Sequence, residues 1–284
     1  MAPTKVVLDI DSVFGKAMAY VMLSRVQSLD QVYILGKLNP KKITIEKKSL
    51  EELKRLERIS INRNPTPWNA PTLGSINIAS LNCMGLRAHH QDLLVDYKLL
   101  KADILQLSET SLTTETDLDS MAIPGFESYH TVVSNGKGIS TYFKETSVLG
   151  HQVESFKGTD FQVSVMSLPN VDCIHVYRSS TASLVETAAA IIARIKDDQP
   201  TLVTGDFNVC TVKQPHNSIS RGLLDLGFSQ LVSKATHIKG GHIDHVYWRD
   251  SVHPVFKEPV VERYSPYYSD HDALLVTLSP INRS

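Results

Sequence analysis

Beyond residue 75 the chain alternates short apolar runs with two helical patterns. The apolar runs are five to eight residues long: INIASL, DILQL, ISTYF, FQVSVMSL, CIHVY, TLVTG, HIDHVYW and ALLVTL. Several alternate with a period of two, which is typical of strands, and helical patterns lie near 89–101 and 182–197. We therefore expect an α/β fold, a two-layer sandwich of two mostly antiparallel β-sheets packed face to face and flanked by helices.

The first sixty residues carry a different pattern. Residues 12–35 are rich in apolar and β-branched side chains, and residues 41–60 form a charged helical pattern. The stretch NRNPTPWNAPTLG, residues 62–74, then places three prolines and three asparagines where neither a helix nor a central strand would tolerate them. This predicts an appendage over 1–61, a linker over 62–74 and the main domain over 75–284.

Composition is that of an ordinary folded protein, with 42% hydrophobic and 21% charged residues. The three cysteines are scattered, without a C-x-x-C pair, which argues against a disulfide framework and a structural zinc site. No apolar run approaches the roughly 18 residues of a membrane span, and the start lacks the order of a secretory signal. We expect an intracellular protein in a reducing compartment, without a membrane partner.

Charge divides the chain at residue 74. Up to that point 12 Lys and Arg residues stand against 7 Asp and Glu residues, and beyond it 17 stand against 23. All 11 histidines also follow residue 74, so the usual metal ligands and proton carriers gather in the second part. That acidity does not favour a nucleic-acid substrate, because phosphate contacts normally need a basic surface.

Polar side chains stand at the ends of several apolar runs, where loops on a rigid scaffold present catalytic groups. GDFN at 205–208 by itself equally fits an ordinary turn, since Gly, Asp and Asn all favour turns. Asp244 sits inside an apolar strand, where a buried charge needs a partner, and His271 would supply one. The converging set is Asn82, Glu109, Asp206, Asn208, Asp244, Asp270 and His271.

Such a set suits metal-dependent phosphodiester hydrolysis. Hard divalent cations prefer carboxylate oxygens, and the reaction needs a metal, a positioned water and donors for the phosphoryl oxygens. In order along the chain, SLNCMGLRA, DILQLSET, IHVYRSS, GDFN, ATHIKGGHIDHVYW and SDH resemble the motifs of the endonuclease/exonuclease/phosphatase superfamily. The resemblance covers residues 75–284 and implies the DNase I-like sandwich, with a retrotransposon-type or exonuclease III-like endonuclease as the nearest type.

The resemblance implies roles for the individual residues. Glu109 and Asp270 would help to hold Mg²⁺ or Mn²⁺, and Asp206 would orient or deprotonate the attacking water. Asn82 and Asn208 would contact the phosphate, the water or their neighbours.

Three further residues would act on the phosphate side. Asp244 would hold His271 in its working tautomer, His271 would bond the scissile phosphate, and Tyr177 would be an additional hydrogen-bond donor. Two positions depart from the apurinic endonuclease pattern: Met84 stands where an acidic or amide group is frequent, and Ser180 where asparagine is frequent. They put second-metal binding and abasic-site specificity in doubt.

The appendage carries a resemblance of its own. AYVMLSRVQSLDQVYIL resembles the closing motif of Helitron-type transposon helicases, in which Arg25 would be the arginine directed toward ATP. No phosphate-binding G-x-x-x-x-G-K-[ST] loop occurs in the chain, so we expect an incomplete helicase fragment without motor activity. The combination implies a transposon-derived, nuclear protein; an unrelated strand-turn-strand appendage is the alternative.

Three functions fit these patterns. The first, to which we commit, is a DNA endonuclease that nicks with Mg²⁺ or Mn²⁺. The second keeps the metal centre but acts on RNA, an inositol phosphate or a sphingolipid, and the acidic balance of 75–284 keeps it open. The third is an inactive relic that binds nucleic acid, against which the intact acidic and histidine set argues.

Overall fold

The computed structural model describes residues 6–9, 32–36, 51, 74–113, 118–133 and 137–281. The chain divides into two compact units, Met1–Thr66 and Pro67–Ser284. In the first unit, β1 (Val6–Asp9) pairs in parallel with β2 (Val32–Leu35). Most of the helicase-like segment with Arg25, the helical pattern at 41–60 apart from Glu51, and the linker up to residue 73 lie outside the described residues.

The second unit contains two six-stranded sheets. The first has the order β11-β12-β10-β9-β8-β7, with β7 (Gln152–Gly158), β8 (Phe161–Leu168), β9 (Val171–Arg178), β10 (Thr201–Asp206), β11 (Ser229–Gln230) and β12 (Asp244–Arg249). The second has the order β13-β14-β3-β4-β6-β5, with β3 (Ile76–Asn82), β4 (Ile104–Ser108), β5 (Glu127–Thr131), β6 (Ile139–Phe143), β13 (Val260–Tyr264) and β14 (Ala273–Leu278). Among the described strands of these two sheets, only the pairs β9–β10 and β3–β4 are parallel. The expected pair of mostly antiparallel sheets is confirmed.

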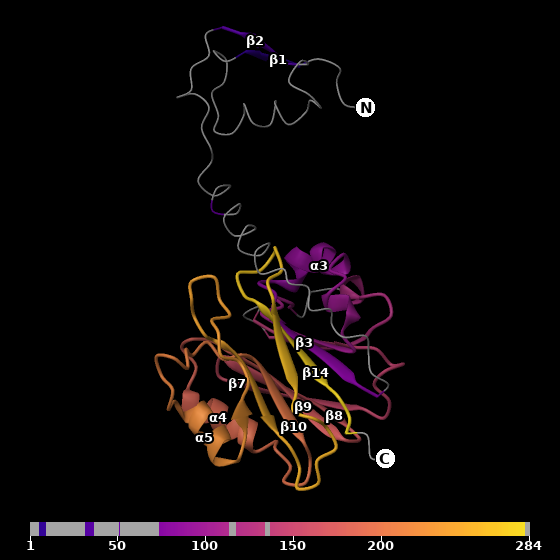
Figure 1. The fold of residues 1–284 in the computed structure, drawn as a ribbon, viewed down its shortest axis with the longest axis vertical. Coiled ribbons are helices and arrows are strands. Elements are labelled where there is room, and N and C mark those ends of the chain that lie inside the picture. Colours follow the sequence, from indigo (N-terminus) through magenta and orange to yellow (C-terminus); the bar gives the residue numbers. More distant parts are fainter. Residues whose placement is uncertain are drawn as a thin grey trace. The chain divides into compact units, whose positions relative to one another are not determined.

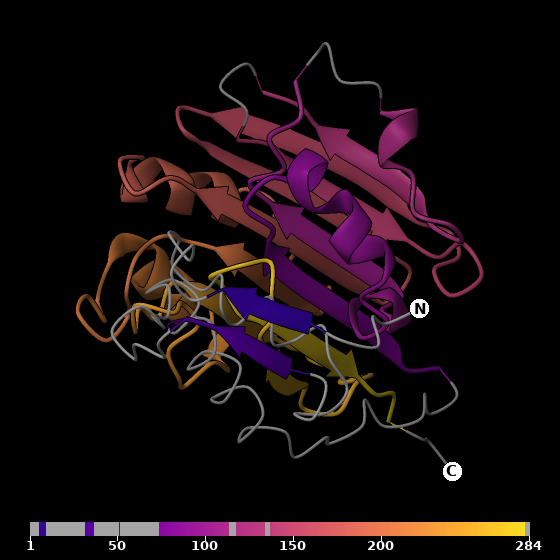
Figure 2. The ribbon, with the colours of Figure 1, turned by 90° about the horizontal axis from the view of Figure 1, so that it is seen from above.

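Short helices flank the sheets (Figures 1 and 2). They are α3 (Leu86–Leu94), α4 (Leu184–Ile192) and α5 (Ser218–Asp225), with 3₁₀ turns at Leu99–Lys101 and Asp119–Met121. Side chains fix two of the starts: Ser183 caps α4 by accepting from Glu186 N, and Asn217 caps α5. No helix among the described residues is long and apolar enough to cross a membrane.

Three apolar layers hold the sandwich together. Between the sheets pack side chains such as Ile104, Met166 and Leu202. On the outer face of the β3 sheet lie residues of α3 and the following 3₁₀ turn, and on the outer face of the β9 sheet lie α4 and α5. The central strands are therefore buried on both faces, which explains why their sequences are almost continuously apolar.

The layering sets neighbouring strands of the two sheets against each other. β12 lies against β14, β10 against β3, and β9 against β4. The carboxyl ends of β3, β4, β9 and β10 and the amino ends of β12 and β14 meet at one edge of the sandwich, as the contacts described next require. One rigid edge can thus receive polar groups from six strands.

Candidate active site

Hydrogen bonds join the two sheets at this edge, one for each pair of facing strands. Each bond links a polar group on the β9–β10–β12 side to one on the β4–β3–β14 side. They run from Tyr177 Oη to Glu109 Oε1 (2.8 Å), from Asn82 Nδ2 to Asp206 Oδ2 (2.9 Å), and from His271 Nδ1 to Asp244 Oδ2 (2.9 Å). The residues that the sequence placed at separate strand ends therefore form one site, and GDFN and SDH lie on the same side of the fold.

Asp206 is the centre of this site. The strand register places it opposite Tyr177 on β9 and opposite Asp244 on β12. Its Oδ2 accepts from Asn82 Nδ2 and from Asn208 Nδ2 (3.0 Å), and its Oδ1 accepts from the Asn208 backbone N–H (2.9 Å). Three donors from two sheets fix the orientation of one carboxylate.

The surroundings of Asp206 make it a proton acceptor. Complete burial raises the pKa of its carboxyl far above the usual range, and the negative charge of Asp244 raises it further. His271 and the hydrogen bond from Asn82 act in the opposite direction without cancelling the effect. A carboxylate with a raised pKa is a stronger base than an exposed one, as proton abstraction from water requires.

The carboxylate of Asp244 holds the His271 ring through its Nδ1. Both oxygens of Asp244 lie within 3.0 Å of its Nδ1, and Thr236 Oγ1 donates to Asp244 Oδ2 at 2.6 Å. Burial alone would lower the pKa of His271, but the hydrogen bond and the charge of Asp244 outweigh it and raise that pKa to about 9. This shift favours the protonated ring, whose Nε2 lies on the side away from Asp244, 3.4 Å from Asn82 Nδ2 and 3.8 Å from Asp270 Oδ1.

Glu109 projects into the site from an unusual backbone conformation. Its φ is 52°, directly after the last residue of β4. Tyr177 donates to Oε1, and Oε2 accepts no hydrogen bond from the described part of the chain. Burial and the charge of Glu109 raise the pKa of Tyr177, so the hydroxyl stays a donor. The expected phosphate donor Tyr177 thus also positions the expected metal ligand Glu109.

Strained backbone concentrates around these groups. Met84 and Asn208 also have positive φ, at 52° and 47°. Gly205 has φ 138°, and a Cβ there would lie 1.9 Å from the carbonyl oxygen of Val176. Such conformations persist only where the surrounding structure imposes them, and they are frequent at functional sites. The glycine of GDFN therefore lets β10 approach β9 closely just before Asp206.

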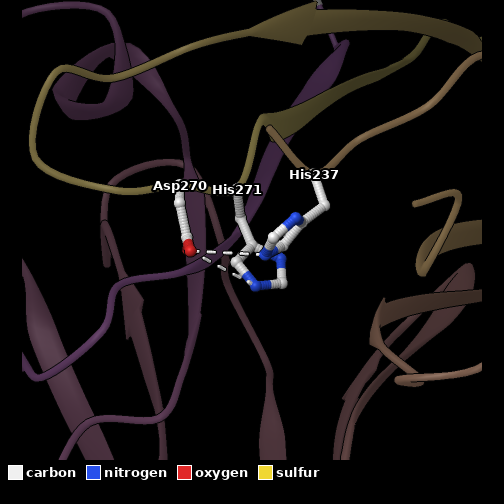
Figure 3. Close-up of side chains that lie close together, drawn as sticks. All are labelled: His237, Asp270 and His271. Atoms are coloured by element: carbon white, nitrogen blue, oxygen red, sulfur yellow. Dashed lines mark ion pairs between the residues drawn. The ribbon is translucent and has the colours of Figure 1, made fainter. Parts of the chain in front are cut away.

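Asp270 lies at the rim, with its side chain 32% exposed. Its Oδ2 is 3.3 Å from His237 Nε2, and its Oδ1 is 3.8 Å from His271 Nε2 (Figure 3). Its backbone N–H faces Met84 Sδ at 3.4 Å. The position that departs from the apurinic endonuclease pattern thus contacts the backbone of the SDH segment.

The acidic side chains offer the oxygen ligands that a divalent cation needs. Among the described residues, two groups bring three possible ligand atoms within 4.8 Å: His237, Asp270 and His271, and Asp206, Asp244 and His271. Glu109 belongs to neither group, so its expected partnership with Asp270 stays a prediction. In the second group, Asp244 is already occupied by His271 and Thr236, which makes it a proton network. Glu109 Oε2 accepts no hydrogen bond from the described residues, and Asp270 lies one-third exposed at the rim, so both side chains could offer oxygen to a divalent cation.

Comparison with known proteins agrees with this geometry. Residues 75–271 match the Endonuclease/Exonuclease/phosphatase family. The chain belongs to this family. No curated protein matches the sequence.

Several solved structures share the fold at low identity. A functionally unknown protein from Enterococcus faecalis is 14% identical, with a TM-score of 0.56 over 72% of this chain and 100% of its own. A 3′-5′ exonuclease from Neisseria meningitidis is 17% identical (TM-score 0.51, 72% and 100%). An AP endonuclease from Archaeoglobus fulgidus is 14% identical (TM-score 0.51, 71% and 98%). The Endonuclease/Exonuclease/phosphatase domain is thus a DNase I-like sandwich and a phosphoester hydrolase.

Four residues of this family site were not assigned a role from the sequence. Thr236 supports Asp244, and Ser269 Oγ donates to the Asn82 carbonyl while accepting from the His271 N–H. The buried Arg178 donates to the Phe207 and Asn208 carbonyls, and His237 faces Asp270. All four stand inside the recognised motifs, so their presence there was a usable signal, but which groups they contact depends on how the loops pack.

Proposed function

We propose that this chain is a DNA endonuclease that nicks with Mg²⁺ or Mn²⁺. The observation that carries the proposal is the edge where three hydrogen bonds cross the sandwich and gather a base, an oriented histidine and metal-fitting carboxylates. A bound divalent cation would neutralise the developing charge on the phosphoryl group, held by Glu109 and Asp270. Hydrolysis of a phosphodiester uses each of these groups.

The reaction needs a proton acceptor and a phosphate donor on this chain. Asp206, oriented by Asn82 and Asn208, would take a proton from water as the water oxygen forms a bond to phosphorus and the bond to the leaving oxygen breaks. His271 would donate Nε2–H to a phosphoryl oxygen and stabilise the charge that accumulates there. Asp244 keeps the His271 ring oriented through Nδ1 during this step.

DNA as the substrate has two supports. Structural neighbours include a 3′-5′ exonuclease and an AP endonuclease, and the THIKGGHIDHVYW stretch resembles retrotransposon endonucleases. Residues 12–38 resemble a Helitron-type helicase end, which favours an origin in a mobile element and a place in the nucleus. The excess of acidic residues beyond residue 74 does not favour a nucleic-acid substrate, and it keeps open the second candidate, in which the metal centre acts on a smaller phosphoester or on RNA.

One assay separates the candidates. The full chain is incubated with supercoiled plasmid, an abasic duplex, a single-stranded RNA and a phosphoinositide, each with Mg²⁺, with Mn²⁺ and with chelator. Asp206→Asn serves as the inactive control for contaminating nucleases. We expect metal-dependent conversion of supercoiled to open-circular plasmid by the wild-type chain alone. Turnover of only the phosphoinositide or the RNA supports the second candidate, and inactivity on all four with intact folding supports a relic.

A further inference from the structure

His237 lies on the loop that connects β11 to β12 and is fixed there by backbone hydrogen bonds. Its N–H donates to the Gly241 carbonyl, and its carbonyl accepts from Gly240 N (2.8 Å). His237 forms an antiparallel bridge with His271, and Ile238 N donates to the Asp270 carbonyl (2.9 Å). The loop is thus attached to the SDH segment on both sides of the imidazole ring.

A backbone contact determines which ring nitrogen of His237 carries the proton. The N–H of Lys239 donates to His237 Nδ1 at 3.0 Å, so Nδ1 is an acceptor. The proton of the neutral ring is then on Nε2, which faces Asp270 Oδ2 at 3.3 Å (Figure 3). The protonated nitrogen of the ring thus lies beside one carboxylate oxygen of Asp270.

The same contact argues against His237 as a metal ligand. Coordination through Nε2 would need a lone pair there, which moves the proton to Nδ1. Nδ1–H would then face the Lys239 N–H, two donors at hydrogen-bonding distance without an acceptor. Three ligand-type atoms lie close together at His237, Asp270 and His271, but the structure presents them as a donor and its acceptor rather than as an ion cage.

We propose that His237 is a positioning residue for Asp270. It holds Oδ2 through Nε2–H, so that Oδ1 is the oxygen offered to the divalent cation of the proposed function, on which this inference rests. Asp270 is otherwise one-third exposed and would lose rotamer freedom on binding an ion. Partners that orient a ligating side chain from behind commonly change metal affinity about 10-fold to 100-fold when they are removed.

The test measures metal binding directly, without substrate. Mn²⁺ is titrated into metal-free full-length protein and the free ion is counted by electron paramagnetic resonance. His237→Phe keeps an aromatic ring against His271 but removes both nitrogens, and His237→Gln restores a donor at a similar reach. His253→Ala, an exposed histidine that lies beside the turns preceding β9 and β10, is the matched control.

We expect the Kd for Mn²⁺ to rise about 10-fold or more in His237→Phe, to stay within about 3-fold of wild type in His237→Gln, and to be unchanged in His253→Ala. The melting temperatures of the metal-free variants should agree, which separates positioning from a folding defect. Wild-type affinity in His237→Phe overturns the inference and leaves the proposed function standing. A loss that His237→Gln does not restore also overturns it, because His237 would then be a ligand. Absence of Mn²⁺ binding by the wild-type chain overturns both.

Discussion

Asp206 and Asp270 place the same functional group in opposite surroundings. Asp206 is fully buried beside Asp244, which raises the pKa of its carboxyl and suits proton transfer, and three donors fix its orientation. Asp270 lies at the rim, one-third exposed, where an ion could reach it. In the proposed function, environment rather than residue type would therefore assign one carboxylate as the base and the other as a metal ligand.

Replacing the base tests the first role. Asp206→Asn keeps the shape of the side chain but removes the group that would accept the proton, so kcat should fall about 100-fold to 10,000-fold. Plasmid nicking at saturating Mg²⁺ measures this. Asp225→Asn makes the same change at an exposed position at the end of α5 and should leave kcat unchanged. Near-normal nicking by purified Asp206→Asn would refute its assignment as the base.

The hydrogen bond between Tyr177 and Glu109 can be removed by deleting a single oxygen atom. Tyr177→Phe preserves the buried ring and deletes a hydrogen bond to a carboxylate, a change commonly worth about 1.5–3 kcal/mol. The concentration of Mg²⁺ that gives half-maximal nicking should rise about 10-fold or more, because Glu109 loses its orientation. Tyr247→Phe is the matched control: its hydroxyl bonds Ser220 on α5. Equal metal dependence in the two variants would contradict the role given to Tyr177.

At the scale of elements, burial decides what the sequence could predict. The central strands β3, β4, β8, β9, β10 and β14 are buried on both faces and read as apolar runs, and each was predicted within one or two residues at most of its ends. The strands β5, β7 and β13 are edge strands whose side chains are mostly exposed or half-buried, so they lack the continuous apolar pattern of the central strands. Hydrophobic patterning cannot identify a strand that is held mainly by backbone hydrogen bonds to its neighbour, because such a strand needs no continuous apolar face.

The helices were predicted in the right places but too long. Instead of one helix over 89–101, α3 ends at Leu94 and a 3₁₀ turn follows, because Asp96 Oδ1 accepts from Lys98 N and Leu99 N and diverts the chain. α4 covers Leu184–Ile192 rather than 182–197. Helix α5 was not predicted from its eight residues. The hydrophobic pattern of a helix can continue past the residue at which a side-chain hydrogen bond ends that helix, so the pattern alone predicts a helix that is too long.

The contact between β10 and β9 supplies a prediction on stability. Gly205→Ala forces a Cβ against the Val176 carbonyl and a side chain into φ 138°, which should lower the free energy of unfolding by about 3 kcal/mol or more. Urea denaturation monitored by circular dichroism measures this. Gly227→Ala, with φ +83° but no atom within 4 Å, isolates the backbone strain and should cost only about 1 kcal/mol. Equal losses of unfolding free energy in the two variants would show that the close approach of β10 to β9 does not explain why GDFN has a glycine.

At the scale of the whole molecule, the site depends on contacts that join distant parts of the chain. Asn82 and Asp206 are 124 residues apart in sequence, and Asn82 and His271 are 189 apart. The ordered motifs predicted that these residues belong to one site, but motif order contains no distances. The contact of His237 with Asp270 and the hydrogen bond of Arg178 to the GDFN backbone could be found only in the packed sandwich, since each joins a loop to another element.

The interior of the sandwich makes folding stability sensitive to acid. Burial lowers the pKa of His175 to about 3 and that of His245 to about 4, while the unfolded chain takes up protons near the ordinary value of 6.5. Since the folded pKa is depressed, the stability contributed by the neutral rings is present above pH 6.5 and is lost as pH falls toward 4. His175 is protonated in the unfolded chain but stays neutral in the folded protein over this range. This difference at His175 alone should lower the free energy of unfolding by about 2 kcal/mol between pH 7 and pH 5.

Urea denaturation of the metal-free protein at pH 7 and at pH 5 measures how far the free energy of unfolding changes between the two pH values, and it does so for each variant separately. His175, which faces Ser108 across the sheets, is replaced by the non-titrating His175→Gln, and the pH 7 to pH 5 difference should shrink by about 2 kcal/mol whatever the variant's stability at pH 7. The exposed His253→Ala should keep the wild-type difference. A His175→Gln variant that retains the full acid loss would show that the buried ring is protonated together with the unfolded chain, and the inter-sheet histidine would then not be the cause of acid sensitivity.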